Sequence, residues 1–267
     1  MIALIGSPGA LTGHLAATLG REGRPHLACV LSDRTDLAPP PGEPLPFRVE
    51  HLGRLLVALR ERGVTGVCFS GGIRRPSVDP SQIDALTMPF VPRFLAAARA
   101  GDDGALRVIL SLFEEAGFAI HAAHEIAPDL LPPAGVLTAA RPTPAHEADA
   151  ARAEQVHRIL APADIGQGVV VRRGQVLAVE ALPGTDFMLD SLRDLARDAL
   201  FYKAPKATQD RRADLPAIGP ATMERARAAG LSAIVIESNG VMVLDRAATV
   251  AAANAAGLVL WVREPGP

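Results

Sequence analysis

The feature that most constrains the fold is the alternation of short apolar segments with amphipathic segments along the first half of the chain. Residues 2–5, 26–31 and 66–69 are predicted strands, and residues 10–20 and 52–62 have the apolar spacing of helices. Strands that alternate with helices form right-handed βαβ units around a mostly parallel sheet. The first half of the chain is therefore predicted to be a doubly wound α/β domain.

Prolines interrupt this alternation between residues 128 and 148, where five of them fall close together. Such a stretch is typical of a domain boundary. The α/β pattern then resumes, with a predicted hairpin whose turn is Arg173-Gly174. We expect a Rossmann-like N-terminal domain over residues 1–127, a proline-rich linker over 128–148 and a C-terminal α/β domain over 149–267. The ligand cleft is predicted to lie between the two domains.

The charged residues narrow the classes of ligand. The chain has 27 Lys and Arg against 29 Asp and Glu, for a net charge of −2. This balance argues against a general nucleic-acid-binding protein. The only lysines are Lys203 and Lys206, three residues apart. Either this pairing is due to chance, or this position needs compact ammonium groups rather than planar guanidinium groups.

The two cysteines, Cys29 and Cys68, each end a predicted strand. They are too few for a disulfide framework or a four-ligand zinc site, so we expect two buried thiols in a reducing compartment. The sequence opens without a basic secretory signal and has no run of about 20 apolar residues that could span a bilayer. A cytoplasmic location is the resulting prediction.

Two glycine-containing loops of the first half are candidate anion sites. Gly9, Ala10 and Leu11 open the first predicted helix, where backbone amides can approach a phosphate. Gly71 and Gly72 follow a predicted strand, and ligands of open α/β sheets lie at that end of the strands. A nicotinamide cofactor, a nucleotide or sugar phosphate, and a plain tight turn all remain open for the first loop. A solvated surface loop remains open for the second.

The second half concentrates charged residues in short motifs. Glu180 follows the predicted hairpin, and Gly184-Thr185-Asp186 is a predicted loop whose helix N-cap and free amides suit phosphate. Lys203 to Gly219 brings together both lysines, two arginines and acidic residues in an irregular stretch. Cations can neutralise phosphate oxygens while carboxylates hold Mg²⁺ or orient water. A solvated charged loop is the alternative.

Several of these motifs resemble, in order, those of the Mg²⁺-dependent UDP-2,3-diacylglucosamine pyrophosphatases of bacterial lipid A biosynthesis, the two-domain kind rather than the calcineurin-like kind. The resemblance covers essentially the whole chain and departs from the family pattern at Ser7, Pro8, Thr12 and Gly72. The motifs that carry it are Gly101-Asp102-Asp103, Ala123-His124-Glu125, Asp164-Ile165-Gly166-Gln167-Gly168, Ala178-Val179-Glu180, Gly184-Thr185-Asp186, Lys203-Ala204-Pro205-Lys206 and Asp214-Leu215-Pro216-Ala217-Ile218-Gly219.

This resemblance implies a hydrolase with a catalytic C-terminal domain. Water would attack the sugar-side phosphorus of UDP-2,3-diacylglucosamine, giving UMP and 2,3-diacylglucosamine 1-phosphate. Asp214 matches the catalytic acid of the family and Arg212 the arginine of the same motif. The predicted catalytic residues are Asp214, Lys203 and Arg212, and the predicted Mg²⁺ ligands are Asp214 and Glu180. The predicted substrate-binding residues are Gly9, Ala10, Leu11, Gly71, Gly72, Gln167, Gly184, Thr185, Asp186, Lys206 and Gln209.

The partner is then expected to be a lipid-linked nucleotide sugar rather than a nucleic acid, with transient contact at the inner-membrane surface. Two other functions stay open. A non-catalytic carrier of lipids or nucleotide sugars would bind such a ligand without turnover. An NAD(P)-dependent oxidoreductase would use the first glycine turn together with Asp33, although the spacing of Gly6, Gly9 and Gly13 is not the dinucleotide fingerprint.

Overall fold

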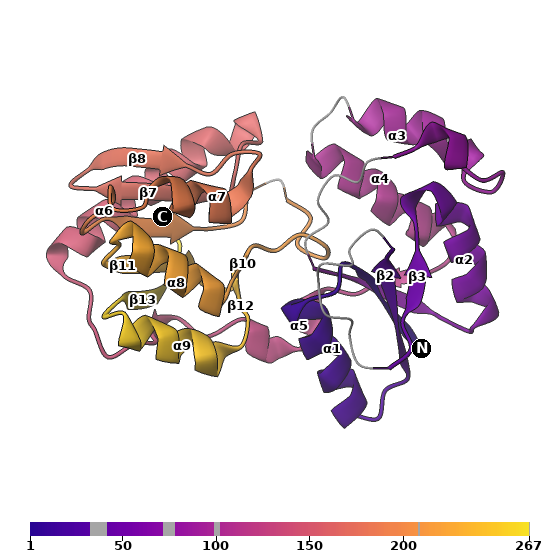
Figure 1. The fold of residues 1–267 in the computed structure, drawn as a ribbon, viewed down its shortest axis with the longest axis horizontal. Coiled ribbons are helices and arrows are strands. Elements are labelled where there is room, and N and C mark those ends of the chain that lie inside the picture. The colour runs from indigo at the N-terminus through magenta and orange to yellow at the C-terminus, as the bar shows by residue number, and fades with distance from the viewer. Residues whose placement is uncertain (33–41, 72–77, 99–101, 208, 267) are drawn as a thin grey trace. The chain divides into compact units, whose positions relative to one another are not determined.

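The computed structural model describes residues 1–32, 42–71, 78–98, 102–207 and 209–266 (Figure 1). The chain divides into two compact units. Unit 1 consists of Met1–Pro128 together with Asp210–Asp214, and unit 2 consists of Asp129–Gln209 and Leu215–Pro267. The polypeptide therefore passes from one unit to the other three times.

Unit 1 is built on a five-stranded parallel sheet with the order β3-β2-β1-β4-β5. One face packs against α2 and α4 through a core that includes Ile5, Leu59 and Phe113. The apolar runs predicted as strands are buried on both faces of this sheet, as expected where helices cover both sides. The strands are β1 (Ile2–Gly6), β2 (His26–Leu31), β3 (Leu45–Phe47), β4 (Gly66–Ser70) and β5 (Ala119–Ile120). The helices are α1 (Ala10–Arg21), α2 (Leu52–Glu61), α3 (Val91–Ala98), α4 (Asp102–Glu115) and α5 (Ala123–Ile126), with 3₁₀ turns η1 (Val49–His51), η2 (Pro80–Gln82) and η3 (Met88–Phe90).

Unit 2 contains a six-stranded mixed sheet with the order β6-β13-β11-β9-β7-β8. Alternate residues point to opposite faces, so Phe201 packs in the core formed with α7, α8 and α9, and Tyr202 packs in the core formed with α6. A second, two-stranded sheet pairs β10 with β12. The strands are β6 (Gly135–Val136), β7 (Gly168–Arg172), β8 (Gln175–Val179), β9 (Leu200–Lys203), β10 (Ala217–Ile218), β11 (Ala233–Glu237), β12 (Met242–Val243) and β13 (Val259–Arg263). The helices are α6 (Pro144–Leu160), α7 (Gly184–Ser191), α8 (Pro220–Ala229) and α9 (Arg246–Ala255), with 3₁₀ turns η4 (Pro128–Leu130) and η5 (Ala161–Ala163).

The predicted α/β class, with a parallel N-terminal sheet and a second α/β domain, is confirmed. The hairpin is also confirmed: β7 and β8 are antiparallel, and Arg173 and Gly174 have φ of 50° and 75° at its turn. The Asp149 carboxylate accepts hydrogen bonds from both turn amides, at 2.9 Å from Arg173 N and 2.7 Å from Gly174 N. The hairpin is thus fixed to α6 by one side chain.

The proline-rich stretch has more structure than the predicted linker. Residues 129–148 belong to unit 2, where β6 pairs with β13 at the edge of the mixed sheet. Pro144 is the first residue of α6, and the Thr143 hydroxyl accepts a hydrogen bond from His146 N at its N-cap. Proline suits the first turn of a helix because its missing N–H would have no partner there. The same residues that suggested a linker therefore begin a helix.

No helix in the described part of the chain is long and apolar enough to cross a membrane.

Both thiols are fully buried, as predicted, and burial raises the pKa of Cys29 and of Cys68 to about 12. At pH 8 we expect the folded protein to react with a thiol reagent about a thousandfold more slowly than a free cysteine, because the thiolate is the reacting species. Absorbance with Ellman's reagent, before and after addition of guanidinium, measures this difference. Rapid labelling of either thiol in the folded protein would contradict the expectation.

Candidate functional site

The carboxyl ends of β1 and β4 lie side by side at the point where the strand order of unit 1 reverses. From β1 the chain builds outward to β2 and β3, and then returns to add β4 on the other side of β1. Ligands of open α/β sheets bind at such a switch point. The two loops predicted from glycine content, after Gly6 and after Ser70, both start there.

A buried hydroxyl network joins these two loops. The Thr12 hydroxyl donates to the Ser7 carbonyl at 2.9 Å and shares a 2.9 Å hydrogen bond with the Ser70 hydroxyl. The backbones are close enough that only glycine fits, since a Cβ on Gly6 would lie 2.0 Å from the Ser70 carbonyl oxygen. Ser7 and Thr12 thus have a structural role in holding the two loops together.

The residues predicted to bind substrate in these loops differ in exposure and in backbone conformation. Gly9 is the N-cap of α1 without a side-chain cap, and Ala10 is exposed. Leu11 is only 9 % exposed and packs in the core, so it has no side-chain surface for a ligand. Gly71 has φ of 81° and closes the contact with Ser7. Gly72 and Asp33 lie outside the described residues.

Unit 2 holds a buried polar cluster around Lys203, the last residue of β9. Lys203 is 4 % exposed, and its ammonium donates to the Thr185 hydroxyl and lies 3.5 Å from Glu180 Oε2. Two segments of the chain supply these groups: the end of β9, and the stretch that runs from Glu180 after β8 to Thr185 in the first turn of α7. The strands β8 and β9 both pair with β7, on its opposite sides, so Glu180 and Lys203 lie on either side of Gly168 at the start of β7.

The glycines of the Asp164-Ile165-Gly166-Gln167-Gly168 motif make room for Glu180. A Cβ on Gly166 would lie 2.1 Å from the Glu180 carbonyl oxygen, and a Cβ on Gly168 would lie 2.7 Å from Glu180 Oε2. Glu180 N donates to the Gly168 carbonyl at 2.8 Å. The two glycines of this motif therefore leave the space that Glu180, the partner of Lys203, occupies.

Lys206 is held in the same region by a second set of contacts. Its ammonium donates to the Asp164 carboxylate, and its backbone N–H donates to Gln209 Oε1 at 3.0 Å. The Gln167 carbonyl accepts a hydrogen bond from Ala204 N at 3.0 Å, which fixes the chain between the two lysines. Both lysines are buried, so both ammonium groups depend on carboxylate or hydroxyl partners within unit 2.

Asp164 pairs with Lys206 and was not among the predicted site residues. Its motif was singled out, but no role was given to its carboxylate. The signal that could have found it is the pairing rule for buried charge: a lysine that is buried needs an acid, and Asp164 opens a motif of the same unit.

The Gly184-Thr185-Asp186 prediction is partly wrong. These residues are the first turn of α7 rather than a loop before it, and the N-cap is Pro183, which makes no side-chain capping bond. Asp186 is mostly exposed and lies 3.5 Å from Arg225 on α8. The Thr185 hydroxyl is the group of this motif that contacts the Lys203 ammonium.

Asp214 and Arg212 belong to unit 1, in the short segment Asp210–Asp214. Arg212 binds the Asp210 carboxylate through Nε at 3.0 Å and Nη2 at 2.7 Å, and it binds Glu114 of α4 through Nη1 at 2.7 Å. Its guanidinium holds the pKa of the Asp210 carboxyl below the usual range. The predicted site residues therefore fall in both units, with Lys203, Lys206, Glu180, Gln167 and Gln209 in unit 2.

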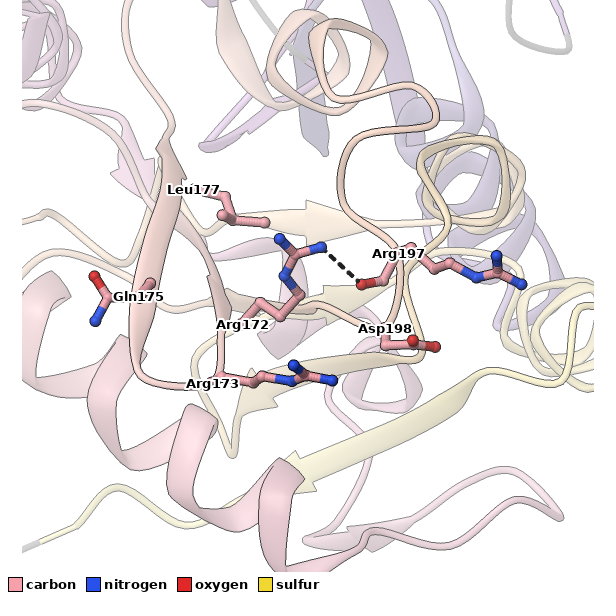
Figure 2. A pocket seen from close by; sticks show the side chains of 6 residues that line it. All are labelled: Arg172, Arg173, Gln175, Leu177, Arg197 and Asp198. Atoms are coloured by element: carbon pink, nitrogen blue, oxygen red, sulfur yellow. Dashed lines mark hydrogen bonds between the residues drawn. The ribbon is translucent and has the colours of Figure 1, made fainter.

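A cavity of about 370 Å³ lies at the other end of the hairpin from Gly168 (Figure 2). Arg172 extends toward the backbone of Arg197 and donates to its carbonyl at 3.3 Å, while the Arg197 side chain points away from Arg172 (Figure 2). None of the predicted site residues lines this cavity, whose walls are Arg172, Arg173, Gln175, Leu177, Arg197 and Asp198.

The predicted Mg²⁺ ligands offer suitable oxygen donors. In the part of the chain that the structure describes, no three His, Cys, Asp or Glu side chains cluster as a metal cage. Mg²⁺ is commonly held by one or two carboxylates together with substrate phosphates, so a single carboxylate fits this mode of binding. Asp214 and Glu180 each carry a carboxylate, and that of Glu180 faces the Lys203 ammonium at 3.5 Å.

A doubly wound unit and a mixed-sheet unit, each with polar groups at strand ends, define a two-domain α/β protein. Comparison with models of protein families identifies the family to which the chain belongs. The LpxI N-terminal domain model matches residues 1–130, and the LpxI C-terminal domain model matches residues 133–261. The chain is also 40 % identical over 275 residues to the UDP-2,3-diacylglucosamine pyrophosphatase LpxI of Caulobacter vibrioides, an alignment that covers 99 % of this chain and 98 % of that protein. The chain belongs to the LpxI family, which confirms the resemblance.

Proposed function

We propose that this protein hydrolyses the diphosphate of UDP-2,3-diacylglucosamine to UMP and 2,3-diacylglucosamine 1-phosphate. The observation that carries the proposal is the 40 % identity to the Caulobacter vibrioides pyrophosphatase, because it extends over 99 % of the chain. The buried ammonium groups of Lys203 and Lys206 support it, since a diphosphate needs positive charge at its oxygens.

In this reaction one water molecule attacks the sugar-side phosphorus, the bond to the bridging oxygen breaks, and UMP leaves with that oxygen. Asp214 orients the attacking water and takes up its proton. Lys203 and Lys206 neutralise the diphosphate as charge moves onto the leaving phosphate, and Thr185 holds Lys203 in place. Since UMP is a stable leaving group once its charge is neutralised, positioning and electrostatics are the main demands on the protein.

Mg²⁺ is part of the proposal. Asp214 is its proposed ligand, with the substrate phosphates completing the coordination. Glu180, the second ligand predicted from the sequence, would have to exchange its contact with Lys203 for the metal. When bound, the ion would supply positive charge at the diphosphate. The proposed location is the cytoplasm, with transient contact at the inner-membrane surface where the lipid substrate lies.

Turnover in ¹⁸O-labelled water tests the reaction and its direction together. The purified protein is incubated with UDP-2,3-diacylglucosamine and Mg²⁺, with and without EDTA, and both products are analysed by mass spectrometry. We expect UMP release that EDTA abolishes, with ¹⁸O in 2,3-diacylglucosamine 1-phosphate and none in UMP. Label in UMP would place the attack on the other phosphorus. Tight binding of the substrate without release of UMP would favour a carrier protein instead.

A further inference from the structure

The segment Asp210–Asp214 carries the proposed catalytic acid on a single turn outside any helix or strand. The amides of Ala213 and Asp214 donate to the Asp210 carbonyl at 3.2 Å and 3.1 Å, which closes the turn. Gln209 before it and Leu215 after it both belong to unit 2, whereas the turn itself belongs to unit 1. A turn this short has no element of its own to hold Asp214 in one place.

Arg212 fastens this turn to unit 1. Inside the turn, two nitrogens of the Arg212 side chain donate hydrogen bonds to the Asp210 carboxylate. Asp210 Oδ1 also accepts a hydrogen bond from Arg212 N at 3.0 Å. The third nitrogen reaches Glu114 on α4 at 2.7 Å. Ala213 packs against the apolar core beneath α4. The arginine thus has one carboxylate partner within the turn and one on the body of unit 1.

We infer that Glu114 is a positioning residue for the reaction, acting through Arg212 to hold the turn that carries Asp214. Its proposed role is indirect, through the contact with Arg212. Its carboxylate fixes the position of the Arg212 guanidinium on α4. Arg212 in turn holds the Asp210 carboxylate, and the Asp210 carbonyl accepts the hydrogen bond from Asp214 N. This inference rests on the proposed function, because it assumes that Asp214 acts in the hydrolysis.

Glu115, the next residue of α4, provides a matched control. It is also exposed, and it also forms an ion pair with an arginine, binding Arg93 of α3 at 2.7 Å and 2.8 Å. Glu115 has the same charge as Glu114 and lies on the same helix, but its partner Arg93 does not belong to the Asp210–Asp214 turn. A general loss of surface charge or of helix stability would affect Glu114 and Glu115 variants alike.

The experiment compares Glu114→Ala with Glu115→Ala in steady-state UMP release. We expect Glu114→Ala to lower kcat by about 10- to 100-fold with little change in KM, since small displacements of a catalytic group cost this much. Glu115→Ala should retain the kcat of the wild type. Glu114→Gln should fall between, because its amide oxygen still accepts a hydrogen bond from Arg212. Equal activity of Glu114→Ala and Glu115→Ala would overturn the inference.

Hydrogen–deuterium exchange separates the inference from the proposed function. Glu114→Ala should speed exchange in a peptide covering residues 209–215, and Glu115→Ala should leave it unchanged, whatever the activity of the protein. Unchanged exchange in Glu114→Ala would overturn the positioning role. Absence of UMP release from the wild type would instead overturn the proposed function, and the exchange result would still decide whether Glu114 holds the turn.

Discussion

Replacement of Asp214 by alanine is expected to lower UMP release by about 10²- to 10⁴-fold, the range in which a single acid–base group contributes to an enzyme. Asp214→Asn should lose nearly as much, because the amide keeps the shape but can neither take up a proton nor supply the charged oxygen that Mg²⁺ prefers. The folded state should be little affected, since Asp214 is only partly buried on a surface turn. Initial rates and thermal unfolding of the two variants, measured side by side, check both statements.

Asp198→Asn is a suitable control for Asp214→Asn, because Asp198 has φ of 62°, a conformation that asparagine tolerates. Asp198 is exposed in unit 2 and lines the arginine cavity at the other end of the hairpin, so its loss removes a carboxylate without touching the proposed chemistry (Figure 2). Wild-type activity in Asp214→Ala would remove Asp214 from the mechanism. If Asp198→Asn lost as much activity as Asp214→Asn, the loss would not be specific to Asp214.

Replacement of Lys203 by methionine is expected to lower both stability and activity. The ammonium is buried against Glu180 and Thr185, so its removal leaves the Glu180 carboxylate in the interior without its cation. Breaking a buried pair from one side costs about 3–5 kcal/mol of unfolding free energy. Loss of the positive charge at the diphosphate should lower kcat by about 10²-fold or more. Urea unfolding and UMP release measure the two effects separately.

The double variant Lys203→Met with Glu180→Gln distinguishes the two contributions. Removing both charges takes away the uncompensated carboxylate, so much of the lost stability should return, as it does when a buried ion pair is replaced as a unit. Activity should stay low, because no ammonium group has been restored. Full activity in the double variant would mean that Lys203 serves the fold alone. Failure to regain stability would mean that the Glu180 charge is satisfied by other groups.

Much of the architecture was predictable because it follows from periodicity. The strands β1 and β4 of unit 1 are apolar runs closed by glycine, and the β7–β8 hairpin is marked by Arg173-Gly174, whose positive φ values match that turn. Composition alone singled out Lys203 and Lys206, in a chain whose other 25 basic residues are arginines, and both lysines are buried in unit 2. Structural features that depend on neighbouring residues in the sequence, such as these strands and this turn, were therefore predicted.

What could not be predicted depends on partners far away in the chain. The prolines around Pro144 suit a linker or a helix start equally well, and only the pairing of β6 with β13 decides between them. The contact between Arg212 and Glu114 joins residues 98 positions apart. Likewise, nothing in the pattern of residues 210–214 indicates that they leave the unit formed by their neighbours, because membership of a unit is decided by tertiary contacts.

The three passages between units also set an order of assembly during synthesis. Unit 1 has its sheet and helices once Pro128 has left the ribosome, yet its last five residues emerge only after Gln209. Until then the apolar surface that receives Ala213, and the carboxylate of Glu114, remain without their partners. Domains generally fold in the order in which they are made. Here the part made first is completed by a piece that arrives more than 80 residues later, so cutting the gene at residue 128 would separate unit 1 from its own final segment.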